Sequence, residues 1–122
     1  QHPFYPHSHV PRQADNIVNA PIAADCSAAE YRKTVEAAWL KKLQDFRPQL
    51  VLISAGFDGH RLDPMAELNL ETEDYRWLTE MLVSVAHDHS NDRIISTLEG
   101  GYHLKALAEG VAAHLEVLNA VY

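Results

Sequence analysis

The chain has 122 residues, of which 47% are apolar, and its formal net charge is −7 at pH 7. The negative charge argues against nucleic-acid binding, which needs a basic face, and no apolar run is long enough to cross a membrane. The single cysteine, Cys26, excludes an internal disulfide and fits the reducing environment of the cytoplasm.

The first part of the chain predicts a loop, a short strand and a helix. Residues 1–15 carry three prolines within eleven positions and no periodicity, which is typical of an extended loop. Residues 16–20 (Asn-Ile-Val-Asn-Ala) have the character of a short strand. Residues 27–30 have capping-box spacing, so we expect a helix from there to about Phe46.

The rest of the chain alternates strands and helices. Leu50–Ser54 and Arg93–Leu98 are predicted strands, and the runs Leu50–Ile53 and Ile94–Leu98 within them predict burial on both faces because they are apolar. Thr72 is the expected N-cap of the helix between them, and a final helix of about sixteen residues follows Tyr102. The order β-α-β-α-β-α predicts an α/β fold with a parallel sheet. Because three strands make a thin sheet, we expect a larger parent sheet or a second copy that completes it.

Two residues that can do chemistry follow the two apolar strands. Ligands bind beyond the carboxyl ends of the strands in an open parallel sheet. Asp58 lies between Gly56 and Gly59, which favours a metal ligand or a general base, although many such residues only cap a turn. Tyr102 follows two glycines, and it either donates its hydroxyl to a developing oxyanion or packs under a turn.

Other titratable residues give weaker signals. His60 lies two residues beyond Asp58, on the same side of an extended segment, which makes it a weak second-ligand candidate. Asp63 precedes a proline and is expected to start a turn. His114 on the final helix is expected at the surface. Three N-terminal histidines form a poor ligand set, since no cysteine or acidic partner accompanies them: His2, His7 and His9.

Several segments, in order, resemble the zinc-dependent histone deacetylase family, which includes acetylpolyamine amidohydrolases and bacterial deacetylase-like amidohydrolases. These segments are Pro3–Pro6, Asn19–Pro21, Ile53–His60, Asp63–Met65 and Leu98–Tyr102, together with the single residues Leu70 and Tyr75. The resemblance covers essentially the whole chain and corresponds to the C-terminal part of the catalytic domain. It implies a three-layer α/β/α, arginase/deacetylase-like fold, in which residues 1–122 are a single partial domain. Glu99 resembles the class II side of the family.

The resemblance also implies roles for individual residues. Asp58 would be one of two aspartates that bind Zn²⁺. Tyr102 would polarise the acetyl carbonyl and stabilise the tetrahedral oxyanion that forms when metal-bound water attacks. The channel for the acetylated side chain would be lined by Phe4, Tyr5, Gly100 and Gly101. The substrate class is acetylated lysine or acetylated polyamine.

The implied zinc site is incomplete in this sequence. The tandem His-His pair and the Asp-x-His zinc ligands of the family have no counterpart at a corresponding place, and a catalytic zinc takes three protein ligands. The chain begins at Gln1, so we expect a piece of a longer or processed cytoplasmic deacetylase, inactive until it associates with the missing N-terminal part. Two alternatives stay open. One is a non-catalytic binding or assembly module that forms a homodimer, and the other is an independent hydrolase that uses Asp58, His60 and the N-terminal histidines.

Overall fold

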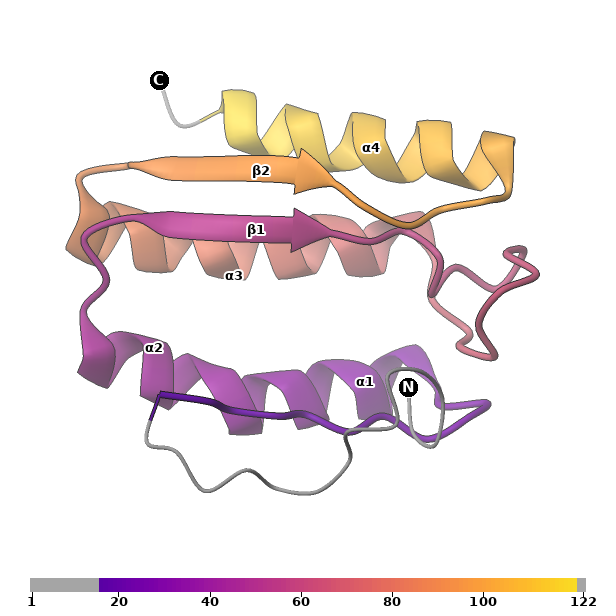
Figure 1. Cartoon of the computed structure of the whole chain (residues 1–122), viewed down its shortest axis with the longest axis horizontal. Helices are drawn as coiled ribbons and strands as arrows, with labels where there is room; N and C mark the ends of the chain where they lie inside the picture. The colour runs from indigo at the N-terminus through magenta and orange to yellow at the C-terminus, as the bar shows by residue number, and fades with distance from the viewer. Residues whose placement is uncertain (1–15, 121–122) are drawn as a thin grey trace.

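The computed structural model describes residues 16–120 and shows an α/β unit with a parallel sheet (Figure 1). The two strands run parallel and pair along their whole length, from Val51 opposite Ile94 to Ala55 opposite Leu98. The expected α/β class is therefore confirmed. The elements in chain order are α1 (Ala28–Val35), η1 (Glu36–Leu40), α2 (Lys41–Phe46), β1 (Val51–Ala55), α3 (Thr72–Ser90), β2 (Ile94–Leu98) and α4 (Leu104–Asn119).

The strand predicted at residues 16–20 is wrong. This segment has no regular structure, and the sheet of the described residues contains only β1 and β2. An extended segment becomes a strand only where a neighbouring strand completes its backbone hydrogen bonds. Figure 1 shows the segment away from both strands, at the level of α1 and α2. Ile17 and Val18 are accordingly exposed.

The predicted first helix is confirmed as a continuous helical run from α1 through η1 to α2. The capping box is present, since the Glu30 backbone N–H donates to Ser27 Oγ and the Ser27 N–H donates to the Glu30 carboxylate. The run ends where Arg47 adopts a left-handed conformation (φ 52°). Its middle turn, η1, widens into a π-helix, a feature that the apolar spacing did not predict.

Helix α3 is the centre of the unit, because it packs against α4, both strands, α1 and α2. Its N-cap is Glu71, one residue before the predicted Thr72. The reason is Asp74, whose Oδ2 accepts the Glu71 backbone N–H at 2.9 Å and so fixes the cap there. Asp74 is only 2% exposed and also accepts from Arg32 Nε at 2.7 Å. This ion pair joins α3 to α1.

One face of the sheet is open. The strands lie in front of α3 in Figure 1, and alternate residues of β1 face the helices, so that Val51 and Ala55 are buried. On the other face, Leu52 and Ile95 are opposite each other and are 69% and 57% exposed. The burial on both faces that the sequence predicted is therefore not present among residues 16–120. The described residues form the sheet and one helical layer of an α/β/α arrangement.

Helix α4 has the predicted extent, and it buries mainly residues with small side chains. Leu104 is 81% exposed, whereas the buried face consists of small residues and one histidine. A Cβ on Gly110 would lie 2.8 Å from Cδ1 of Phe57, so the absence of a side chain there allows close packing. The buried residues of α4 are Ala106, Gly110, Ala113 and His114.

His114 is buried, so its expected surface position is wrong. Its Nδ1 lies 2.8 Å from Thr79 Oγ1 on α3, and its Nε2 lies 2.9 Å from Ser96 Oγ on β2. The imidazole thus joins three elements through both ring nitrogens. Burial lowers the pKa of His114, because a charged ring would be desolvated there.

Candidate active site at the carboxyl ends of the strands

The two loops that follow β1 and β2 are held side by side by backbone hydrogen bonds. The Glu99 N–H donates to the Ala55 carbonyl at 2.9 Å, and the Phe57 N–H donates to the Gly100 carbonyl at 2.8 Å. These bonds extend the parallel pairing beyond the ends of the strands. The residues that follow, Asp58 on one loop and Gly101 on the other, are therefore brought to the same edge of the sheet.

The carboxylate of Asp58 lies against the backbone of both strand ends. A Cβ on Gly100 would be 2.7 Å from Asp58 Oδ2, and one on Gly56 would be 3.0 Å from Oδ1. Real Cβ atoms do not approach other atoms at 2.7 Å, so the carboxylate can occupy this place only because residue 100 is glycine. Asp58 itself is partly exposed, as a residue that meets a ligand must be.

Gly101 has a positive φ of 135°, a conformation that residues with side chains rarely adopt. The space beside its Cα is filled, since a Cβ there would lie 2.7 Å from Leu107 Cδ1 and 3.2 Å from Phe57 Cβ. Gly101 therefore packs its α-carbon onto the core and turns the chain toward Tyr102. Any contribution of Gly100 or Gly101 to a substrate channel would come from the backbone.

Asp63 connects the two loops. Its Oδ2 accepts the backbone N–H of Tyr102 at 2.6 Å and that of His103 at 3.0 Å, and its Oδ1 accepts the Met65 N–H at 2.9 Å. Burial alone would raise the pKa of Asp63, but the three N–H bonds outweigh it, and the pKa is lowered. The bond from Met65 is the predicted Asp-Pro turn. The bonds to the Tyr102 loop were missed, because sequence gives no sign of a partner so far along the chain.

The Tyr102 side chain is 58% exposed at this edge of the sheet. Its phenol is thus accessible to a ligand, while its backbone N–H is held by Asp63. The aromatic residues Phe4 and Tyr5, predicted to lie on a channel wall, are outside the described residues. So are His2, His7 and His9.

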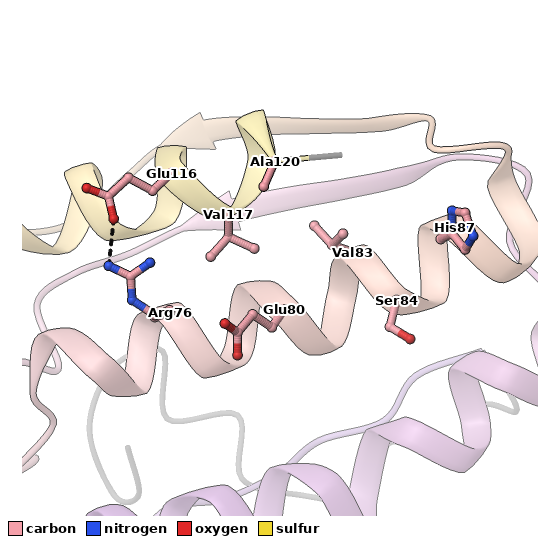
Figure 2. A pocket seen from close by; sticks show the side chains of 8 residues that line it. All are labelled: Arg76, Glu80, Val83, Ser84, His87, Glu116, Val117 and Ala120. Atoms are coloured by element: carbon pink, nitrogen blue, oxygen red, sulfur yellow. Dashed lines mark hydrogen bonds and ion pairs between the residues drawn. The ribbon is translucent and has the colours of Figure 1, made fainter. Parts of the chain in front are cut away.

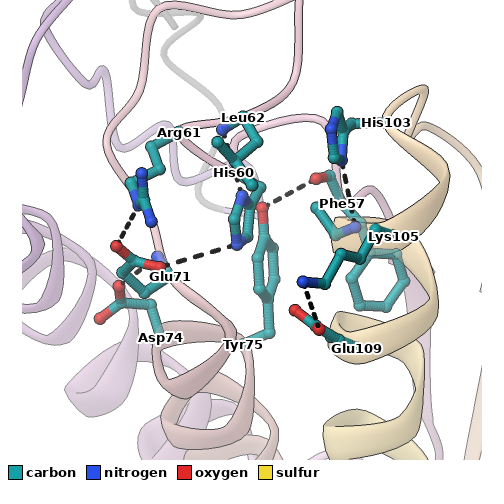
Figure 3. Close-up of polar contacts among 11 residues, drawn as sticks. Phe57, His60, Arg61, Leu62, Glu71, Asp74, Tyr75, His103, Lys105 and Glu109 are labelled. Carbon is teal, nitrogen blue, oxygen red and sulfur yellow. Dashed lines mark hydrogen bonds and ion pairs between the residues drawn. The ribbon is translucent and has the colours of Figure 1, made fainter.

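His60 has a packing role in this structure. It is 2% exposed, its Nδ1 accepts the Leu62 N–H at 3.2 Å, and its ring stacks on Tyr75 at 6.5 Å between centroids (Figure 3). Its Nε2 lies 3.8 Å from the carboxylate of Glu71. Within residues 16–120, no group of three or more His, Cys, Asp or Glu side chains is arranged to hold a metal ion. The described residues alone therefore do not fit a catalytic zinc site, and Asp58 offers one ligand only.

Tyr75 supports the Asp58 loop from below, a role that sequence reasoning missed because the residue fits an ordinary apolar helix position. Its hydroxyl donates to the Phe57 carbonyl at 2.9 Å (Figure 3). The Phe57 ring contacts those of Tyr75 and His114, with centroids 5.1 and 5.9 Å away. Burial raises the pKa of Tyr75, so its hydroxyl keeps the proton that this bond needs. Phe57 is thereby anchored one residue before Asp58.

A groove between α3 and α4 lies apart from these loops (Figure 2). Its volume is about 580 Å³, and Arg76 on α3 donates to Glu116 on α4 at 2.7 Å beside it. Its lining includes neither Asp58 nor Tyr102.

In the described part of the chain, no helix is both long and apolar enough to span a membrane.

Comparison with known proteins gives a consistent result. Residues 1–118 match the histone deacetylase domain family. The chain is 41% identical over 104 residues to type-2 histone deacetylase 1 of Dictyostelium discoideum, a match that covers 85% of this chain and 7% of that protein. It is 32% identical over 85 residues to a histone deacetylase-like amidohydrolase of Pseudomonas aeruginosa, covering 70% of this chain and 22% of the relative.

A solved structure shares the fold. The acetylpolyamine aminohydrolase of Burkholderia pseudomallei superimposes with a TM-score of 0.70 and 26% sequence identity, over 84% of this chain and 28% of that one. The chain therefore spans less than a third of the length of each of these three relatives.

Proposed function

Because this chain belongs to the histone deacetylase domain family, we propose that residues 1–122 form the C-terminal part of a single catalytic domain that hydrolyses acetyl-amide bonds. The substrate is acetylated lysine or an acetylated polyamine. The observation that carries the proposal is the Asp58 carboxylate, held against Gly100 where the two parallel strands end. This is the edge of an open sheet at which ligands bind.

In this proposal Asp58 supplies one ligand to Zn²⁺, and the remaining ligands come from residues outside those described. Zinc in such a site lowers the pKa of water and polarises a carbonyl. A catalytic zinc takes three protein ligands, and the described residues do not provide them. The sequence also has no counterpart of the family's His-His pair and Asp-x-His ligands. In this proposal the chain is inactive by itself, and it becomes part of a working site only in a longer or associated protein.

Tyr102 is the proposed oxyanion-stabilising residue. Its exposed phenol projects from the loop beside Asp58, and a hydroxyl donor aimed at the acetyl oxygen stabilises charge that develops there in the transition state. The backbone of Gly100 and Gly101, with Phe4 and Tyr5, would line the channel that leads the acetyl group to this edge. We further propose a cytoplasmic location, which the free thiol of Cys26 supports.

The test compares the natural protein that contains this sequence with the 122-residue chain. Zinc content and deacetylation of an acetyl-lysine peptide and of an acetylated polyamine are measured for both. We expect activity in the former and none in the latter. Asp58→Asn should remove zinc and activity, whereas Asp88→Asn, a change of an exposed carboxylate on α3, should alter neither. Activity of the zinc-loaded 122-residue chain would instead support an independent hydrolase.

The open sheet face favours a second function, that of a non-catalytic assembly module. Leu52 and Ile95 present an exposed apolar pair that a second copy of the chain can cover. Light scattering and zinc analysis of the natural protein separate the two functions, because a defined zinc-free dimer supports the module and contradicts the deacetylase.

A further inference from the structure

Asp63 holds two consecutive peptide groups of the other loop. One oxygen, Oδ2, accepts both the Tyr102 and the His103 N–H, at 2.6 and 3.0 Å. A single bond would leave a backbone free to rotate about it, whereas two consecutive N–H groups on one atom fix the direction of the peptide between them. Hydrogen bonds to a charged carboxylate are also about twice as strong as neutral ones. The position of Tyr102 is therefore fixed from the Asp58 loop.

The other end of this connection is rigid. Asp63 is 7% exposed, its own N–H donates to the His60 carbonyl at 2.8 Å, and its second oxygen is occupied by Met65. The loop that carries it is closed by backbone bonds from Arg61 to Leu70 and from Leu70 back to Gly59. Backbone N–H groups thus bind both carboxylate oxygens of Asp63.

Tyr102 depends on such an anchor. It follows two glycines, whose backbones have more conformational freedom than those of other residues. Its side chain is 58% exposed, so packing does little to place the phenol. Just beyond it, His103 caps α4 by accepting the Ala106 N–H at its Nδ1. Asp63 thus binds the chain where flexible glycines meet the rigid helix.

We propose that Asp63 is a positioning residue, which sets the Tyr102 phenol at a fixed place relative to Asp58. The proposal rests on the proposed function, because the chemical role of Tyr102 does. Asp63 itself touches no reacting atom. A misplacement of about 1 Å in a reacting group can cost about a hundredfold in rate, so loss of this anchor is expected to lower turnover more than substrate binding.

The kinetic test uses Asp63→Ala in the active natural protein. The methyl group has no acceptor, so the N–H groups of Tyr102, His103 and Met65 all lose their partner. We expect kcat to fall about tenfold to a hundredfold, KM to stay within about twofold, and bound zinc to be unchanged. Asp63→Glu keeps the charge and should recover part of the loss. Asp88→Ala is the matched control with no expected effect.

A double-mutant cycle separates positioning from a merely structural role. If Asp63 acts through Tyr102, Asp63→Ala should cause no further loss in a Tyr102→Phe background, because the group that it positions is already absent. An equal loss in both backgrounds would overturn the proposal. Wild-type activity of Tyr102→Phe alone would instead contradict the proposed function.

Amide hydrogen exchange gives a readout that needs no activity. In Asp63→Ala, or in Asp63→Glu if the first variant does not fold, the N–H groups of Tyr102 and His103 should exchange faster. The Ala113 N–H, in the middle of α4, should keep its rate. Unchanged exchange at Tyr102 and His103 would show that Asp63 does not hold this loop.

Discussion

The Asp58 carboxylate occupies the space that a side chain at Gly100 would need, with Oδ2 2.7 Å from the position of the missing Cβ. These two residues follow different strands, so their contact exists only because the parallel pairing continues beyond β1 and β2. Glycine at position 100 therefore determines where the Asp58 carboxylate can lie.

Gly100→Ala should therefore displace Asp58. Three atoms of the carboxyl group lie within 2.9 Å of the added methyl, so the side chain must rotate away. In the natural protein we expect zinc affinity and kcat/KM to fall about tenfold to a hundredfold, as for other changes that misorient a metal ligand. Zinc titration and steady-state kinetics measure this. Gly59→Ala is the matched control, because its methyl would meet the side chains of Leu68 and Leu70 and not the Asp58 carboxylate. Equal losses of zinc affinity and of kcat/KM in the two variants would contradict this explanation.

His114 should make stability depend on pH. Burial lowers its folded-state pKa, so below the ordinary value of 6.5 the unfolded chain binds more protons than the folded one. The free energy of unfolding is thus fully retained above pH 6.5 and decreases as the pH falls from there toward the folded-state pKa. Urea unfolding at a series of pH values between 7.5 and about 5 measures this. His114→Gln should flatten the curve in that window, and a curve of unchanged slope would assign the effect to other groups.

Two ion pairs should differ in their contribution to stability. Asp74 is 2% exposed, and removing its partner with Arg32→Ala leaves a buried charge with one hydrogen bond fewer. The expected cost is about 2 kcal/mol of unfolding free energy. Lys41→Ala breaks an exposed pair with Asp45 and should cost less than about 0.5 kcal/mol. Chemical denaturation of both variants checks the difference, and equal costs would mean that burial of Asp74 is unimportant.

The open face of the sheet should make the 122-residue chain associate with itself. Leu52 and Ile95 form an exposed apolar pair on this face, and a charged lysine there would be costly to bury against a second copy. Leu52→Lys should therefore shift the population toward the monomer in light scattering. Leu104→Lys changes a more exposed leucine on α4, 81% exposed, and should have little effect. If the unchanged chain, Leu52→Lys and Leu104→Lys had the same mass distribution, this face of the sheet would be excluded as the contact between copies.

The positions of helices and strands were predicted most accurately where they depend on residues close together along the chain. The capping box at Ser27 and the two apolar runs placed the first helix and both strands, because those signals act over a few residues. The segment at residues 16–20 was misassigned, since a strand requires a pairing partner that local pattern does not reveal. His114 was misplaced for a related reason, because its burial depends on Thr79 and Ser96 from other elements.

The same distinction applies to the candidate site. The glycines beside Asp58 and before Tyr102 pointed to two loops at one edge of the sheet, and their side-by-side backbone is what the structure shows. Asp63 was interpreted as a turn residue, which its bond to Met65 confirms. Asp63 also accepts the Tyr102 N–H, and this bond forms only because the β1–α3–β2 crossover brings the two loops together. The spacing of residues along the chain does not reveal that contact.

The parallel pairing of β1 with β2 also determines when the site can form during folding. In the sequence, the whole of α3 separates β1 from β2. Pairing of the two strands therefore closes a long loop, and this costs more conformational entropy than a contact between residues close together in the chain. Helices form within about a microsecond, whereas such long-range pairing is slow. Asp58 and Gly100 meet only after that pairing. The reactive carboxylate is therefore assembled late, and a chain with its helices already formed still has no site until the two strands have joined.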